Sequence, residues 1–281
     1  MKFGVFMFTT DYSMSPIELA RAAEERGFES LFVPEHTHIP TSRRSPWPGG
    51  AELPQEYYHL LDPFVALASA AAVTSRLRVG TAICLVPQHH PITLAKQVAS
   101  LDHISGGRFI FGIGAGWNEE EMQHHGVDPS TRWQVMRESV LAMKAIWTQD
   151  EAQFHGRFVD FEPLWSWPKP VQKPHPPVYV GGHGRRVLER AVEYGDGWMP
   201  IYAREHDLGA RIRELQQLAA ERGRGPIPVT VLGVPPRPEA LEECARLGVE
   251  RCIFWLRPAP ADETLPYLDQ LASLAREFAA A

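Results

Sequence analysis

The stretch PVYVGGHGRR at residues 177–186 joins a short apolar run to glycines, a histidine and two arginines. A second stretch, FIFGIGAGW at residues 109–117, also runs from apolar residues into glycines. Both apolar runs are continuous rather than alternating, as expected of parallel strands that are buried on both faces. An apolar run that ends in glycines ahead of a helical pattern predicts a strand followed by a turn and a helix. These two stretches therefore predict a parallel α/β fold.

The same pattern recurs along the whole chain. Apolar runs predict eight strands, at residues 3–8, 30–33, 77–86, 109–113, 178–180, 197–201, 229–234 and 252–256. Helical patterns alternate with them, at residues 15–26, 64–73, 92–104, 132–147, 185–194, 205–222, 239–247 and 263–278. This favours an α/β protein with a (β/α)8 TIM barrel over an open doubly wound sheet, which usually has fewer strands. We expect one barrel domain over residues 1–281.

Three connections are too long for ordinary loops, at residues 36–61, 117–131 and 149–176. The last of them is rich in proline and aromatic residues, which predicts a hairpin followed by an extended strap rather than a domain boundary. Barrel enzymes build their active sites from the loops at the C-terminal face. We therefore expect these insertions to surround the functional site.

Composition restricts the partners of the chain. The formal net charge is −6 at pH 7, and the 28 lysines and arginines are spread along the sequence. Neither feature is typical of a nucleic-acid-binding protein, so we expect a small-molecule partner.

The cysteines and the N-terminus indicate the compartment. Cys84, Cys244 and Cys252 are an odd number without a CxxC spacing, which suits a reducing compartment. The N-terminal apolar run at residues 3–8 is too short for a membrane span, so we expect a cytoplasmic protein.

The glycines of residues 177–186 have two interpretations. Bare backbone N–H groups ahead of a helix, with Arg185 and Arg186 beside them, can cradle a phosphate. Alternatively, Gly181 and Gly182 serve a tight turn by adopting unusual dihedral angles. The stretch GIGAGW does not match a dinucleotide fingerprint, because the third glycine of that pattern would fall on Trp117.

A histidine pair follows the second predicted strand, in SLFVPEHTHIP at residues 30–40. His36 lies at the expected rim of the barrel and can exchange a proton near neutral pH. His36 and His38 also have a metal-ligand spacing, and His183 ends another predicted strand, so a metal-dependent barrel hydrolase is an alternative. A hydrogen-bonded or surface histidine without catalytic function is the third interpretation.

Aromatic residues gather in the loop after the second strand, SRRSPWPGGAELPQEYYHLL at residues 42–61. Trp47, Tyr57 and Tyr58 accompany Gly49 and Gly50, a combination that suits a lid over an organic substrate. The alternative is a surface loop whose aromatic side chains pack on the barrel rim.

Taken together, four segments in this order resemble one family. They are VGTAICLVPQHHP at residues 79–91, FIFGIGAGWNEEEM at 109–122, FHGRFVDFEPLWSWPKPVQKPHPPVYVGG at 154–182 and GDGWMP at 195–200. The set resembles the bacterial luciferase-like flavin and deazaflavin oxidoreductases over nearly the whole chain. The amino-acid sequences of the middle segments are most similar to those of the branch that depends on coenzyme F420, a deazaflavin. The other branch uses FMN.

The resemblance implies a coenzyme ring at the C-terminal mouth of the barrel. It implies a cis peptide bond at Ala82–Ile83, proton transfer or oxyanion contact by His36, and hydride transfer to or from an organic substrate. It also assigns cofactor contacts, to Ala82, Ile83, Ala115, Gly116, Trp117 and the turn of Gly181, Gly182, His183, Gly184 and Arg185. An FMN-dependent monooxygenase and a flavin binder without turnover stay open as alternatives. A homodimer is expected as well, since family members often pair through helices outside the barrel.

Overall fold

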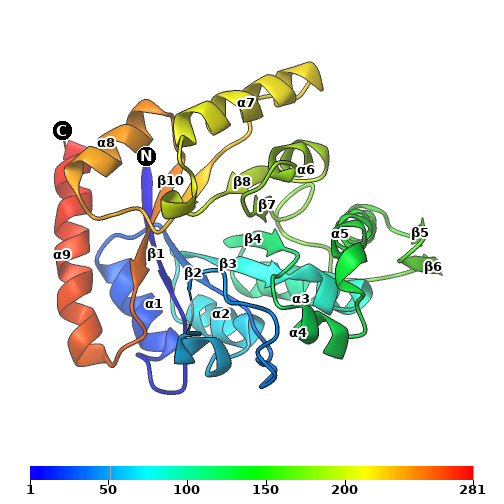
Figure 1. Cartoon of the computed structure of the whole chain (residues 1–281), viewed down its shortest axis with the longest axis horizontal. Helices are drawn as coiled ribbons and strands as arrows, with labels where there is room; N and C mark the ends of the chain where they lie inside the picture. Colours follow the sequence, from blue (N-terminus) through cyan, green and yellow to red (C-terminus); the bar gives the residue numbers. More distant parts are fainter. Residues whose placement is uncertain (51, 281) are drawn as a thin grey trace.

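A single sheet of eight parallel strands curls into a barrel in the computed structural model (Figure 1), which describes residues 1–50 and 52–280. The strand order is β8-β7-β4-β3-β2-β1-β10-β9. Parallel bridges from Trp198 to Val229 and from Ile201 to Leu232 join β8 to β9 and close the circle. The strands are β1 (Lys2–Met7), β2 (Ser30–Val33), β3 (Arg78–Leu85), β4 (Phe109–Gly114), β7 (Val178–Gly181), β8 (Gly197–Met199), β9 (Thr230–Leu232) and β10 (Arg251–Leu256).

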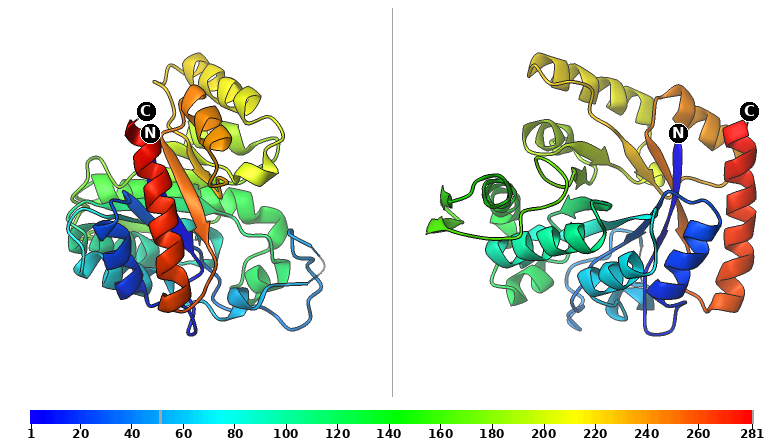
Figure 2. Two further views of the ribbon diagram at one scale, coloured as in Figure 1. Left: turned by 90° about the vertical axis from the view of Figure 1, so that its left-hand side faces the viewer. Right: turned by 180° about the vertical axis from the view of Figure 1, so that it is seen from behind.

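Helices surround this barrel, and the predicted (β/α)8 fold class is confirmed. They are α1 (Pro16–Glu25), α2 (Pro63–Ala72), α3 (Pro91–Ile104), α5 (Arg132–Thr148), α6 (Val187–Glu193), α7 (Leu208–Glu221), α8 (Pro238–Arg246) and α9 (Ala261–Ala280). Ser15 and Asp62 cap α1 and α2, and a proline follows each cap. Figure 2 shows α9 running alongside α1, close to both chain termini.

The strands alternate between two apolar layers. Val5 and Met7 of β1 pack outward against the helices, whereas Phe6 and the following Phe8 point into the barrel. The same alternation holds in β10, where Phe254 belongs to the outer layer and Ile253 to the inner one. Burial of both faces explains why the strands read as continuous apolar runs.

The long connections carry extra elements. The predicted hairpin is confirmed as β5 (Ala152–His155) and β6 (Asp160–Leu164), and an extended strap follows it. The long connection at residues 117–131, in which the sequence predicts no helix, contains α4 (Glu119–His124), which Asn118 caps. Short 3-10 turns complete the set, at η1 (Gln55–Tyr58), η2 (Val86–Gln88), η3 (Pro129–Thr131) and η4 (Tyr202–Arg204).

Two further observations concern the whole chain. None of the helices in the described residues is long and apolar enough to cross a membrane. Cys84, Cys244 and Cys252 are buried free cysteines.

Candidate active site

A cavity of about 320 Å³ opens among the loops at the carboxyl ends of the strands. The first side of the cavity comes from β3, β4 and β7 with their following loops, at Ala82, Ile83, Leu85, Gly114, Ala115, Gly116, Trp117, Gly181, Gly182 and His183. The opposite side comes from β1, β9, β10 and the loop after β2, at Phe6, Phe8, Trp47, Tyr57, Leu232 and Trp255. This is the position where barrel enzymes hold their substrates.

A ledge on β3 forms the floor of the first side. The Ala82–Ile83 peptide bond is cis, as the family resemblance implies, and the register with β4 shifts between Thr81 and Cys84. A Cβ atom on Gly114 would lie 1.8 Å from Ile83 Cδ1, and one on Gly181 would lie 2.6 Å from Ile83 Cγ2. The Ile83 side chain therefore fills the space that the two missing side chains leave, and it presents an apolar surface to the cavity.

A buried ion pair holds this ledge from behind. Glu35 Oε1 lies 2.7 Å from His89 Nε2, and Glu35 Oε2 accepts the Leu85 N–H at 2.5 Å. Burial alone would raise the pKa of Glu35, but His89 and the Leu85 amide outweigh burial and lower it. Burial would conversely lower the pKa of His89, and the Glu35 carboxylate raises it instead. Both shifts favour the charged forms, and the pair ties the loop after β2 to β3 and η2.

Cys84 lies close to the same pair. Its thiol and the Glu35 and His89 side chains place three potential metal-ligand atoms within 4.8 Å of one another. Burial raises the pKa of Cys84 well above its ordinary value, with a further contribution from Glu35, so the sulfur stays a protonated thiol. Since both Glu35 oxygens already accept hydrogen bonds, the group acts as a structural clamp.

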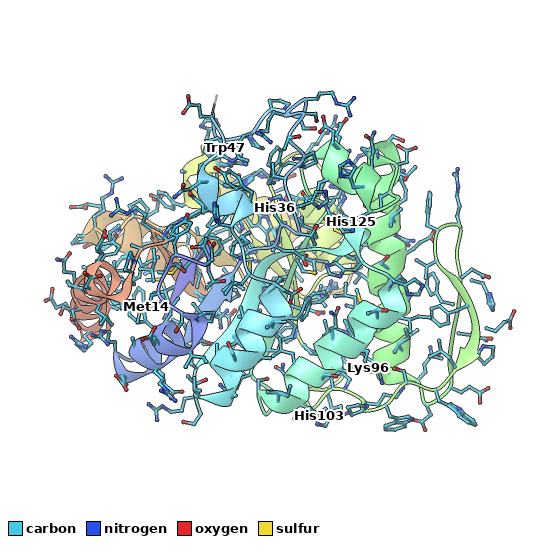
Figure 3. The ribbon with its side chains drawn as sticks, turned by 90° about the horizontal axis from the view of Figure 1, so that it is seen from below. Met14, His36, Trp47, Lys96, His103 and His125 are labelled. Atoms are coloured by element: carbon cyan, nitrogen blue, oxygen red, sulfur yellow. The ribbon has the colours of Figure 1, made fainter. Side chains whose placement is uncertain are left out.

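His36 faces the cavity in a fixed orientation. Its Nδ1 lies 2.7 Å from Glu121 Oε2, and the side chains are 6% and 0% exposed, respectively. Tyr57 and Trp117 flank the imidazole, with ring centroids 5.4 and 5.8 Å away. A carboxylate on Nδ1 leaves Nε2 as the nitrogen that is free to exchange a proton. Figure 3 shows His36 between the labelled Trp47 and His125 in that view.

The glycine turn after β7 is held by a second carboxylate–histidine pair. Gly182 and Gly184 have φ of +121° and +75°, values that favour glycine. His183 Nδ1 lies 2.7 Å from Glu205 Oε1, and burial lowers the pKa of His183. Arg211 donates to the Gly184 carbonyl at 2.9 Å. The backbone N–H groups of residues 183–186 donate no hydrogen bond to any residue that the structure describes.

The predicted site residues are only partly brought together. His36, Trp47, Tyr57, Ala82, Ile83, Ala115, Gly116, Trp117, Gly181, Gly182 and His183 all line the cavity. Tyr58 does not line it: the side chain is 55% exposed and its ring lies 5.0 Å from that of His59. Gly184 and Arg185 follow the lining residues, and the helix predicted from residue 185 begins only at Val187. The positive φ angles of Gly182 and Gly184 prolong the turn, so the helix begins two residues later than predicted.

The three histidines that could bind a metal, His36, His38 and His183, have different hydrogen-bond partners. His36 is bonded to Glu121, and His183 to Glu205. His38 instead lies 2.8 Å from His124 and 2.9 Å from the Thr37 hydroxyl. The HxH pair of residues 36 and 38 is therefore not assembled as one ligand set.

Several lining or supporting residues are not predicted from the sequence. Glu121, Glu205 and Arg204 support or line the site, and Phe6 and Trp255 line its aromatic side. The run of three glutamates after Asn118 is a signal for the first turn of a helix and could have located α4. The aromatic residues carry no such signal, because each lies inside an apolar strand pattern.

Comparisons with known proteins agree with this architecture. A family model described as luciferase-like monooxygenase matches residues 1–253. An uncharacterized protein of Mycobacterium tuberculosis is 44% identical over 278 residues, which cover 97% of this chain and 98% of that protein. An FMNH2-dependent dimethylsulfone monooxygenase of Pseudomonas putida is 32% identical over 155 residues, covering 54% of this chain and 42% of that protein.

Two solved structures share the fold over nearly the full chain. Monooxygenase RslO1 from Streptomyces bottropensis has a TM-score of 0.81 at 20% identity and covers 99% of each chain. An F420-dependent secondary alcohol dehydrogenase, in complex with an F420–acetone adduct, has a TM-score of 0.77 at 19% identity and covers 97% of each chain. The match of the family model over most of the sequence shows that this chain belongs to the luciferase-like monooxygenase family.

Proposed function

We propose that the protein is a coenzyme F420-dependent oxidoreductase, which transfers a hydride between the deazaflavin and a small organic substrate. The observation that carries the proposal is one cavity with three features: the Ile83 ledge, the glycine turn after β7 and the His36–Glu121 pair. The F420-dependent alcohol dehydrogenase that shares the fold supports the same cofactor.

The residues of the cavity fit a flat ring with an anionic tail. Ala82, Ile83 and the residues 115–117 would hold the ring, because they form an apolar side next to bare glycine backbone. The turn of residues 181–185 would hold the tail, because the amides of residues 183–185 donate no hydrogen bond to any described residue and Gly182 has no side chain to block a close approach. Arg185 and Arg204 would add positive charge there.

His36 manages the proton of the reaction. When bound, the deazaflavin accepts or donates a hydride at its C5 carbon, and it reacts poorly with oxygen. In the oxidation of an alcohol, His36 Nε2 takes the hydroxyl proton as the hydride leaves the carbon, and in the reverse reaction it returns the proton to the carbonyl oxygen. Glu121 accepts the Nδ1 hydrogen and holds the ring in place.

Cofactor titration of the purified apoprotein tests this function. We expect a tight complex with F420 and a weaker one with FMN, and we expect His36→Ala to lower turnover by roughly 100-fold or more while cofactor affinity stays unchanged. Absence of F420 binding would contradict the proposal. Turnover that requires an added divalent metal would favour the hydrolase, and cofactor binding without any turnover would favour a flavin binder.

An FMN-dependent monooxygenase is the second candidate. It is supported by the FMNH2-dependent relative and by the monooxygenase that shares the fold. A reduced flavin activates oxygen, whereas a deazaflavin moves a hydride. Oxygen consumption by the protein loaded with reduced FMN, compared with substrate-dependent F420 reduction in the absence of oxygen, distinguishes the two.

A further inference from the structure

We infer that the substrate is an uncharged molecule with a flat apolar body and one hydroxyl or carbonyl oxygen. The inference rests on the proposed function, because it assigns the first side of the cavity to the cofactor. The substrate then faces the opposite side, which β1, β9, β10 and the loop after β2 supply.

Aromatic rings cover that opposite side. The Trp255 ring lies 4.6 Å from the Phe6 ring and is stacked on the Phe8 ring at 5.9 Å. The Tyr57 ring lies 4.8 Å from Phe8 and 5.8 Å from Trp47. Phe6 and Phe8 belong to the set that points into the barrel. Trp255 lies two residues after the inward-pointing Ile253 on β10 and lines the cavity, so its ring is on the same face of the strand. Aromatic rings that are packed together in this way offer their exposed faces and edges to a further flat ring beside them.

Trp255 is the member of this group that a ligand would bury. The neighbouring Phe6 and Phe8 are 2% and 3% exposed, whereas Trp255 is 40% exposed. Gly233 lies next to it, where an added Cβ would approach the Trp255 ring to 3.3 Å. A large indole ring that lines a cavity and stays accessible gains free energy when an apolar molecule covers it.

The charges around the cavity favour an uncharged substrate. Glu35 is paired with His89, His36 with Glu121, and His183 with Glu205. Among the described lining residues the remaining charged side chain is Arg204, which follows β8 and lies close enough to both His183 and Tyr57 to interact with them electrostatically. The proposed function assigns its charge to the anionic tail of the cofactor. A charged group placed among Phe6, Phe8 and Trp255 would lose its hydration without gaining a partner.

The substrate needs one hydroxyl or carbonyl oxygen, because His36 is the one proton-exchanging group of the proposed reaction and lies beside the aromatic side of the cavity. The His36 ring lies 5.4 Å from Tyr57, at the junction between the two sides of the cavity. A hydroxyl or carbonyl at that junction can hydrogen-bond to His36 Nε2 while the rest of the molecule lies on the rings. This arrangement matches an alcohol–carbonyl pair and disfavours a sugar phosphate or a carboxylic acid.

Calorimetric titration of the cofactor-loaded protein tests the inference. The probes are 2-naphthol, 2-naphthoate and glucose 6-phosphate at pH 7, because the two naphthalenes differ only in the charged group. We expect 2-naphthol to bind at least about tenfold more tightly than the other two. We expect Trp255→Ala to weaken 2-naphthol binding by roughly tenfold and Trp255→Phe to restore most of it, with cofactor affinity unchanged in both.

Trp165→Ala is the matched control, since Trp165 is 79% exposed and does not line the cavity. Tighter binding of 2-naphthoate or glucose 6-phosphate overturns the inference, and so does a Trp255→Ala variant that binds 2-naphthol like the parent. In both cases normal cofactor binding leaves the proposed function standing. Failure to bind either cofactor overturns the proposed function and the inference with it.

Discussion

At the scale of single residues, Glu121 decides how His36 works. Its Oε2 holds His36 Nδ1 at 2.7 Å, and its Oε1 is buried without a hydrogen-bond partner among the described residues. Glu121→Gln keeps one acceptor oxygen for Nδ1–H but replaces the other carboxylate oxygen by an amide nitrogen, which weakens the charge-assisted hydrogen bond that orients the imidazole. We expect kcat to fall roughly tenfold to 100-fold, with unchanged cofactor affinity. Glu119→Gln, on the exposed side of α4, is the control; a kcat of Glu121→Gln equal to that of the parent would contradict this role.

The same residues show what the sequence could predict of the site. His36 is predictable because it directly follows a buried strand at the expected rim of a barrel. Glu121 is not, because it is the last of three consecutive glutamates and only the fold of α4 decides which carboxylate turns inward. Glu119 is exposed, Glu120 holds Ser45 at the base of the Trp47 loop, and Glu121 reaches His36. Tyr58 is the opposite case, since η1 turns it toward solvent while its neighbour Tyr57 enters the cavity.

At the scale of elements, β3 packs against the glycines that end β4 and β7, because the Ile83 side chain fills the space beside Gly114 and Gly181. Gly114→Ala would place a Cβ 1.8 Å from Ile83 Cδ1, so the Ile83 side chain must move out of the floor of the cavity. We expect the free energy of unfolding to change little, because Ile83 is flexible at that end, and cofactor affinity to fall at least about tenfold. Gly225→Ala is the control, since an added Cβ there meets nothing within 4 Å. Equal cofactor affinity in the two variants would show that the ledge does not contact the ring.

Element boundaries follow the sequence wherever burial controls them. The continuous apolar runs locate all eight barrel strands, because both faces of each strand are buried. Element boundaries are predicted wrongly where backbone conformation, rather than burial, decides where an element begins. The helix after β7 begins at Val187 because Gly182 and Gly184 take positive φ and lengthen the turn. The short helix α4 was missed because its six residues contain no apolar repeat.

At the scale of the whole molecule, the barrel has an apolar interior near the cavity and a polar seam at its other end. Arg251 of β10 is 2% exposed and donates to both oxygens of Glu29, each at 2.7 Å, and to the Thr230 hydroxyl of β9 at 3.0 Å. Glu29 immediately precedes β2, so the guanidinium connects three segments of the barrel. The Tyr179 hydroxyl donates to Glu250 at 2.6 Å in the same region. An ion pair therefore holds together the ends of the strands that lie opposite the site.

Removal of that ion pair should destabilise the whole barrel in a pH-dependent way. Burial alone would raise the pKa of Glu29, but the hydrogen bonds and charge of Arg251 outweigh it and lower the pKa. We expect Glu29→Gln to lower the free energy of unfolding by roughly 2 kcal/mol at pH 7, because the buried guanidinium loses the carboxylate that accepts two of its hydrogen bonds and keeps only Glu250, at 3.3 Å, as a charged partner. A lowered carboxyl pKa stabilises the fold above the ordinary glutamate value of about 4.3 and loses that contribution as the pH falls through the folded-state pKa. In urea unfolding, the difference in the free energy of unfolding between parent and variant should therefore be complete at neutral pH and shrink below about pH 4.3. Glu263→Gln, which breaks the exposed pair with Arg257, should cost less than about 1 kcal/mol, and an equal cost for the two variants would refute the role of the buried pair.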